Sequence, residues 1–199
     1  MTVAPSTAPV DELRRLAHGL IQQATSFVAP TKLKETARRL VAGEGAELIL
    51  EDDYALDLAE ILASDLALYA PSLTGSTSLD RLARQHRPST PAEAEALRLL
   101  RGARFCLFKI TAQLGQGLFA AEDLATGARF TLDSETMSTS AVGFELGSRL
   151  CWVRADLAFP ILPSFSLNAQ ALNAAQIFIR PGGKGLSLSL IHISQGIVR

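Results

Sequence analysis

Arginines recur in this sequence at a spacing that could bind a polyanion. Two series have arginine at every third residue: Arg81, Arg84 and Arg87, then Arg98, Arg101 and Arg104. On a helix, residues three apart lie on one face, so each series predicts a basic stripe. Such a stripe can contact the phosphate backbone of a nucleic acid. The alternative is that the stripes face the acidic segment 44–65 or lie in water, where ion pairs are individually weak.

The acidic segment, residues 44–65, contains eight Asp or Glu residues and no Lys or Arg. A hard cation needs oxygen ligands that converge from a loop with a tight glycine turn, and this segment lacks that spacing and that glycine. Glu51, Asp52 and Asp53 instead suit the positive N-terminal end of the following helix. The sequence therefore predicts neither a metal site nor a cofactor.

Cysteine and histidine offer little further chemistry. Cys106 and Cys151 lie in apolar runs, each two residues after an arginine that could stabilise a thiolate on the same strand face. The alternative is that both are buried thiols that pack as small apolar side chains. His18 and His86 have no partner at metal-ligand spacing, and the sequence contains no phosphate-binding loop, serine elbow or kinase motif. We therefore predict no catalytic residue.

Composition narrows the class of protein. The 199 residues include 19 basic and 20 acidic side chains, and 48% of them are apolar. So much apolar content with so little net charge excludes a mainly disordered chain, and the charge balance argues against a dedicated DNA-binding or polybasic membrane protein. The N-terminus has no secretory signal pattern, and no uncharged run is apolar enough to span a membrane. We expect a soluble, cytoplasmic protein.

Helical periodicity dominates the first half of the chain. Apolar residues three or four apart predict helices over about residues 11–24, 31–41, 54–69, 79–86 and 91–102. Asp11 and Thr31 are the expected N-caps of the first two helices. A capping box from Thr90 to Glu93, with proline at the first helical position, is expected to open the last.

From Arg104 onward the pattern is that of short strands. Strands are expected at Phe105–Ile110, Leu118–Ala121 and 128–133, with a loop over 134–147 and a further strand over 149–155. The prediction is an α+β protein. An N-terminal helical bundle (residues 8–102) precedes a small antiparallel β-domain (103–162), SH3-like or OB-like in size. Residues 163–185 are expected to form a helix and loop, with the helix over 168–179.

The central part of the chain carries a resemblance. The run GAELILEDDYALDLAEILASDLALYA, followed by DLATG and a strand, is similar to hypothetical proteins of alphaproteobacteria over about residues 43–159. That group has no assigned activity, so the resemblance implies organisation but no function.

The last residues resemble something other than an evolved protein. Leu188–Ser194 (LSLIHIS) resembles one translated frame of a transposase mosaic-end sequencing adapter. This predicts a gene cut near residue 185 and a non-native tail over 186–199. The alternative is a true strand, because leucine alternates with serine from Leu186 to Leu190.

Taken together, these patterns predict a non-enzymatic binding or adaptor module that engages a partner protein or nucleic acid. The first alternative is a nucleic-acid-binding protein that uses the six arginines on helices 79–86 and 91–104. The second is an enzyme whose catalytic part lies in a missing C-terminus. No membrane partner is expected, and the oligomeric state stays open.

Overall fold

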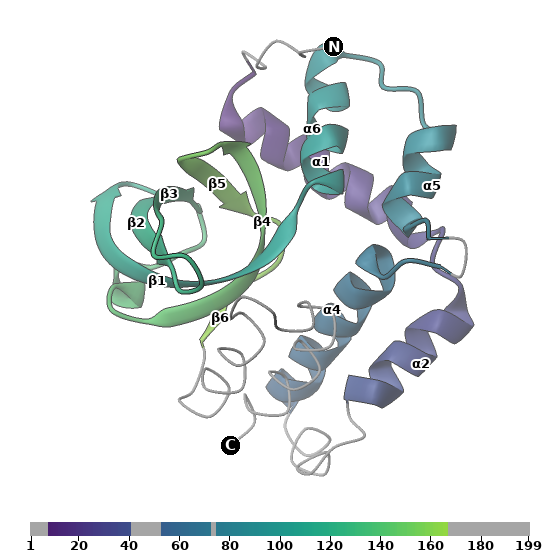
Figure 1. The fold of residues 1–199 in the computed structure, drawn as a ribbon, viewed down its shortest axis with the longest axis horizontal. Helices are drawn as coiled ribbons and strands as arrows, with labels where there is room; N and C mark the ends of the chain where they lie inside the picture. Colours follow the sequence, from purple (N-terminus) through teal and green to yellow (C-terminus); the bar gives the residue numbers. More distant parts are fainter. Residues whose placement is uncertain (1–7, 41–52, 73–74, 167–199) are drawn as a thin grey trace.

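A computed structural model describes residues 8–40, 53–72 and 75–166 of the chain. The protein belongs to the α+β class, as the sequence predicts: the described helices lie on one side of the molecule and a small β-barrel on the other (Figure 1). The helices are α1 (Val10–Thr25), α2 (Pro30–Leu40), α4 (Asp53–Tyr69), α5 (Ser78–Gln85) and α6 (Pro91–Arg101). None of them is both long and apolar enough to cross a membrane.

Side-chain caps fix the starts of α5 and α6. At α5, Thr77 and Asp80 form a complete capping box, in which each side chain accepts a hydrogen bond from the other's backbone N–H. At α6, the Thr90 hydroxyl accepts from the N–H of Glu93 at 3.1 Å, as predicted. The reciprocal half differs from the prediction, because the Glu93 carboxylate accepts from the N–H of Ser89 instead of Thr90.

The expected caps of the first two helices are wrong by one or two residues. The N-cap of α1 is Pro9, so Asp11 lies inside the first turn, where its negative charge still suits the helix dipole. Helix α2 begins at Pro30, which places Thr31 inside it. Proline is favoured at a first helical turn because its missing N–H has no partner there in any case.

The β-half is a closed barrel. Its strands are β1 (Arg104–Gly115), β2 (Leu118–Asp123), β3 (Arg129–Asp133), β4 (Glu145–Arg154), β5 (Leu157–Pro160) and β6 (Phe165–Ser166). The order is β1-β2-β3-β5-β4, with β1 paired to β4 to close the ring and β6 added to the edge of β4. The predicted all-antiparallel sheet is wrong on one point, because β3 and β5 run parallel.

Strand pairing is set by tight turns. Gly117 turns the β1–β2 hairpin with φ +70°, and Gly127 turns the β2–β3 hairpin with φ +71°, a backbone conformation that favours glycine. In the second turn the Asp123 carboxylate accepts the N–H groups of Ala125 and Thr126 at 2.8 and 3.0 Å. The DLATG hairpin turn is therefore where the sequence predicts it.

The sequence-based strand assignment missed three features. The expected loop over 134–147 contains a short 3-10 helix, η1 (Thr139–Ala141), and the first residues of β4. Strands β5 and β6 were not expected, because each is too short to establish an alternating pattern. The expected helix over 168–179 and the tail over 186–199 lie outside the described residues.

Two buried clusters organise the packing. One fills the barrel and includes the fully buried Phe108, Phe119 and Leu132. The other joins α1, α5 and α6 to the outer face of β4 and β5, where Cys151 and Phe159 are 0% exposed. Helix α1 and the barrel thus share one core, which fixes the surface between them.

Candidate functional site

Two of the six predicted binding arginines are held by carboxylates on the helices themselves. Arg98 donates to both oxygens of Glu95, one turn earlier on α6, at 2.6 and 2.7 Å. Arg101 donates from Nε and Nη2 to one oxygen of Asp80 on α5, at 3.1 and 2.9 Å. These partners, Glu95 and Asp80, lie outside the acidic segment 44–65 that the sequence analysis gave, together with water, as the alternative surroundings of the stripes.

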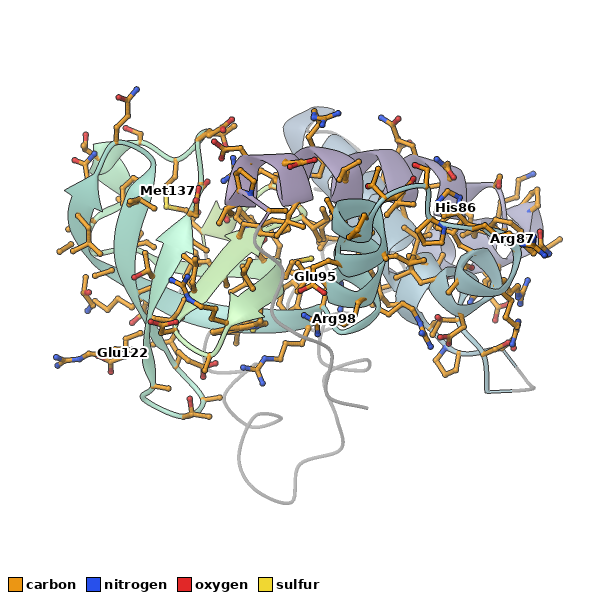
Figure 2. All side chains as sticks on the ribbon, turned by 90° about the horizontal axis from the view of Figure 1, so that it is seen from above. His86, Arg87, Glu95, Arg98, Glu122 and Met137 are labelled. Carbon is orange, nitrogen blue, oxygen red and sulfur yellow. The ribbon has the colours of Figure 1, made fainter. Side chains whose placement is uncertain are left out.

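The other four arginines are dispersed. The Arg104 guanidinium lies 4.6 Å from the ring centroid of Trp152. Arg81 donates to the carbonyl of Phe27 at 3.3 Å, whereas Arg84 and Arg87 are exposed. Figure 2 shows Arg87 at the end of the molecule farthest from the barrel and Arg98 near its middle. The arginines therefore do not form one continuous basic surface.

Asp65, from the described part of the acidic segment, forms a buried ion pair. Asp65 on α4 accepts a bidentate pair of hydrogen bonds from Arg149 on β4, with Nε–Oδ1 and Nη2–Oδ2 distances of 2.6 and 2.7 Å. The same guanidinium lies 3.7 Å from the ring centroid of Tyr69 and donates to the carbonyl of Ala103 at 3.3 Å. This pair joins α4 to the barrel and is closed to solvent, with side chains 1% and 8% exposed.

Burial weakens the case for a reactive cysteine. Asp65 holds Arg149, and the Arg149 charge only partly offsets the effect of burial on the pKa of the Cys151 thiol. Burial raises the pKa of Cys151 to about 12 and that of Cys106 to about 11. Both are buried free thiols, which is the alternative that the sequence analysis gave for them.

The two histidines that the structure describes have different surroundings. His86 pairs with Glu93 at 3.0 Å between Nε2 and Oε1, next to the start of α6. His18 lies on α1 and faces the cavity described below. Within residues 8–40, 53–72 and 75–166, no three His, Cys, Asp or Glu side chains come together in a way that could hold a metal ion.

A large cavity lies between α1 and the barrel. Its volume is about 970 Å³, within the range of ligand-binding clefts. Its lining comes from three segments: Asp11, Glu12, Arg14, Arg15 and His18 on α1, residues 134–136 after β3, and residues 160–163 at the end of β5. One wall is charged, and the opposite wall, which includes Ile161 and Leu162, is apolar.

Arg14 is the centre of the charged wall. Its guanidinium bonds to Asp133 on β3 and lies 2.7 Å from Glu135 and 3.3 Å from Asp11. It also lies 5.9 Å from the ring centroid of Phe159. The Arg14 side chain is only 11% exposed, and its Nε atom has no hydrogen-bond partner among the described residues. Three carboxylates therefore share one cation.

A second cavity, of about 460 Å³, continues along the same face of α1. It lies between Ile21 and Thr25 of α1 and the residues Glu60, Ile61, Ser64, Asp65 and Leu68 of α4. Leu162 lines both cavities. The cavity-lining positions of α1 are 11, 12, 14, 15, 18, 21 and 25, and each has a neighbour three or four residues away, so they form one helical face. We call the two cavities together the α1 groove.

The groove perturbs the ionisable groups around it. Burial raises the pKa of Asp133, Arg14 opposes that rise, and the neighbouring carboxylates of Asp11 and Glu135 add to it. Burial lowers the pKa of His18 from its ordinary 6.5, and the Arg14 charge lowers it further. His18 is therefore an uncharged imidazole at neutral pH, and the groove keeps an excess of negative charge.

Sequence reasoning missed this site. It found no metal-ligand partner for His18 and gave no role to Arg14 or Glu135. The only local signal is the row of charged residues along one face of α1. The opposite wall comes from residues 134–136 and 160–163, more than 100 positions away, and no spacing in the sequence links them to α1.

Comparisons of the chain with protein-family models, curated proteins and solved structures found no match. The function is therefore inferred from the geometry alone.

Proposed function

We propose that this protein is a non-enzymatic binding module that holds a segment of a partner protein in the α1 groove. The observation that carries this proposal is the pair of cavities, about 970 and 460 Å³, that follow one face of α1 and share Leu162. Concave sites with mainly apolar walls and a few convergent polar groups are where proteins bind ligands.

The groove favours binding over catalysis. A nucleophilic hydroxyl needs a base within hydrogen-bond reach to activate it. In the first cavity the imidazole of His18 lies near the fixed charge of Arg14, which lowers its pKa, and Ser134 is almost completely buried. The charged wall is also occupied by a guanidinium that is fixed between carboxylates, which suits recognition better than proton transfer.

The barrel topology fits the same role. A closed order β1-β2-β3-β5-β4, with β3 and β5 parallel, is that of an OB-type barrel. Barrels of this type serve many unrelated binding functions through sites on their surface. The OB-like alternative of the sequence analysis is therefore the one that we retain.

Nucleic-acid binding has less support than protein binding. OB-type barrels bind nucleic acid on the outer face of β2 and β3, with aromatic platforms and a basic groove. Here the outward positions of these strands include Glu122, Arg129 and Asp133, a mixture of charges, with no aromatic side chain between them on β2 or β3. The six arginines do not compensate, because they are dispersed and Arg98 and Arg101 are paired with acids.

The test selects ligands without assuming their sequence. Random hexapeptides displayed on phage are selected against the folded chain, and bound peptides are then measured by fluorescence anisotropy. Thr136→Trp and Thr25→Trp each place a large ring in one of the two cavities from an exposed position. We expect both variants to weaken the selected peptides by at least about tenfold, since the ring takes the space of the ligand.

Ala125→Trp is the matched control. Ala125 is exposed in the β2–β3 turn, so this variant adds the same ring outside the groove and should leave affinity unchanged. Failure to enrich any peptide, or equal binding by all three tryptophan variants, would contradict the proposed function.

A further inference from the structure

We infer that the α1 groove takes an extended peptide of about six residues, with an Arg or Lys side chain at the barrel end and apolar side chains after it. This inference rests on the proposed function and names the chemistry of the partner segment.

The length of the bound peptide is inferred from the length of α1 that lines the groove. Asp11 and Thr25 mark the two ends of the groove on α1. At 1.5 Å per residue this part of the helix spans about 21 Å, and an extended chain advances about 3.3 Å per residue, so about six residues fit. A helix laid in the groove would need about fourteen residues for the same span and a channel about 10 Å wide. The two cavities meet at Leu162, and a single extended strand can place side chains in both with fewer residues than a helix.

The basic residue of the peptide is inferred from the net negative charge around the first cavity. Asp11, Glu12 and Glu135 line the first cavity, and Asp133 lies directly behind Arg14. The cations at this end are Arg14 and Arg15, because His18 is uncharged at neutral pH. Four carboxylates against two guanidinium groups leave a net negative charge. The Asp11 and Glu135 side chains are 73% and 66% exposed, so a partner cation can reach them.

The apolar residues follow from the opposite wall and from the second cavity. Ile161 and Leu162 face the charged residues of α1 in the first cavity, and Ile21, Ile61 and Leu68 dominate the second. Burial of apolar side chains against such walls supplies most of the affinity of a peptide site. Glu60 is the exposed acid at this far end, and Asp65 is already neutralised by Arg149.

The extent of the groove favours a peptide over a small amine. The lining residues run along α1 from Asp11 in the first cavity to Thr25 in the second. A small amine would fill only the charged end, whereas an extended peptide can place its cation there and apolar side chains along the rest of the groove.

The experiment measures labelled hexapeptides by fluorescence anisotropy on the full chain. One peptide carries arginine followed by leucine, proline and valine residues, the second has the same residues in reverse order, and the third has glutamate in place of arginine. We expect one of the two arginine peptides to bind at least about tenfold tighter than the glutamate peptide. The double variant D11N/E135Q should weaken that arginine peptide by about three- to tenfold and leave the glutamate peptide no weaker.

Glu122→Gln is the matched control, because Glu122 is a carboxylate on the barrel at the end of the molecule away from the helices (Figure 2). It should change affinity by less than about twofold, and circular dichroism checks that every variant is folded. Equal binding of the arginine and glutamate peptides, or no binding of either, would overturn the inference. If phage-selected peptides still lose affinity with T136W or T25W in that case, the proposed function stands and only the ligand chemistry is wrong.

Discussion

Two arginines join the helices to the barrel, and they do so in opposite ways. Arg149 projects from β4 to Asp65 on α4, with both side chains less than 9% exposed and each carboxylate oxygen bonded. Arg14 projects from α1 to Asp133 on β3, and it shares its charge with Glu135 and Asp11 at the rim of a cavity. We call the first contact closed, because it is buried and pairs one carboxylate with one guanidinium. We call the second contact open, because it is partly exposed and three carboxylates surround one guanidinium.

The difference separates a structural contact from a binding site. A buried ion pair is stable only when each charge is matched and its remaining donors are satisfied, and the Asp65–Arg149 pair meets that condition through Tyr69 and Ala103. At Arg14, the buried Nε has no hydrogen-bond partner among the described residues, and two of the three carboxylates are largely exposed. The exposed carboxylates beside the cavity are therefore available to pair with a cation on a ligand.

The largest effect is expected at the closed contact. Asp65→Ala should lower the free energy of unfolding by about 3–5 kcal/mol, because it leaves the Arg149 charge buried without a counter-ion. Urea denaturation measures this loss. The double variant Asp65→Leu with Arg149→Met should recover much of it, because no charge then remains to be compensated. A loss below about 1 kcal/mol in the single variant would contradict this account of the contact.

Cys151 reports on the same contact. Folding raises its pKa from 9.0 to about 12, so thiolate is scarce in the native protein at pH 8 and reaction with a disulfide reagent should be slow. Because the folded state holds the Cys151 thiol proton more tightly than the unfolded state, the free energy of unfolding falls as pH rises above 9. In Asp65→Ala the reaction of Cys151 should accelerate more than that of Cys106, which lies inside the barrel.

A smaller effect is expected at Tyr69. Its hydroxyl donates to the carbonyl of Leu100 at 3.0 Å, while its ring covers Arg149. Tyr69→Phe keeps the ring and removes the hydrogen bond, so it should lower the free energy of unfolding by about 1 kcal/mol. Tyr69→Leu removes the ring as well and should cost more in the same urea titration. Equal losses in the two variants would show that the ring contributes nothing to the closed contact.

The open contact should tolerate change. Glu135 is 66% exposed, so Glu135→Gln should alter the free energy of unfolding by less than about 1 kcal/mol. Asp133→Asn should cost more, because that carboxylate is only 17% exposed and accepts directly from Arg14. Thermal unfolding at matched salt compares the two variants. A larger loss for Glu135→Gln would mean that the rim of the groove is structural.

The smallest effect concerns His18. Because its folded pKa lies below 6.5, the unfolded chain takes up the proton first, and His18 destabilises the fold as pH falls below that value. His18→Gln should reduce the loss of stability between pH 7 and pH 5 and change little at pH 7. An NMR titration of the imidazole gives its pKa directly, and a value above 6.5 would contradict the predicted direction.

Local pattern predicted most of the secondary structure. The helix over 54–69 and the strand from Phe105 onward are where periodicity places them, because spacing along the chain records which face of an element is buried. The errors occur where local pattern is short. Strand β5 has four residues and depends on two neighbours for its hydrogen bonds, and the parallel β3–β5 pairing is fixed only when the barrel closes.

The candidate arginines teach the same lesson about side chains. Arg81, Arg84, Arg98 and Arg101 lie on the predicted helices, but Arg87 lies beyond the end of α5 and Arg104 begins β1, so each predicted stripe lacks its last arginine. Arg101 is paired with Asp80 from a neighbouring helix, and Arg104 stacks on Trp152 from β4. Spacing in the sequence predicts which residues share a helix face, but it does not predict which other side chains that face contacts.

The sequence by itself therefore determined the elements: capped helices, glycine turns, an α+β class and the row of charges along α1. Only the tertiary structure decided which charged groups form a buried, matched ion pair and which remain exposed beside a cavity. Asp65 and Arg149 are 84 residues apart, and Arg14 and Asp133 are 119 apart. The physical reason is that propensity and periodicity act over a few residues, whereas desolvation and ion pairing depend on which distant segments the core brings together.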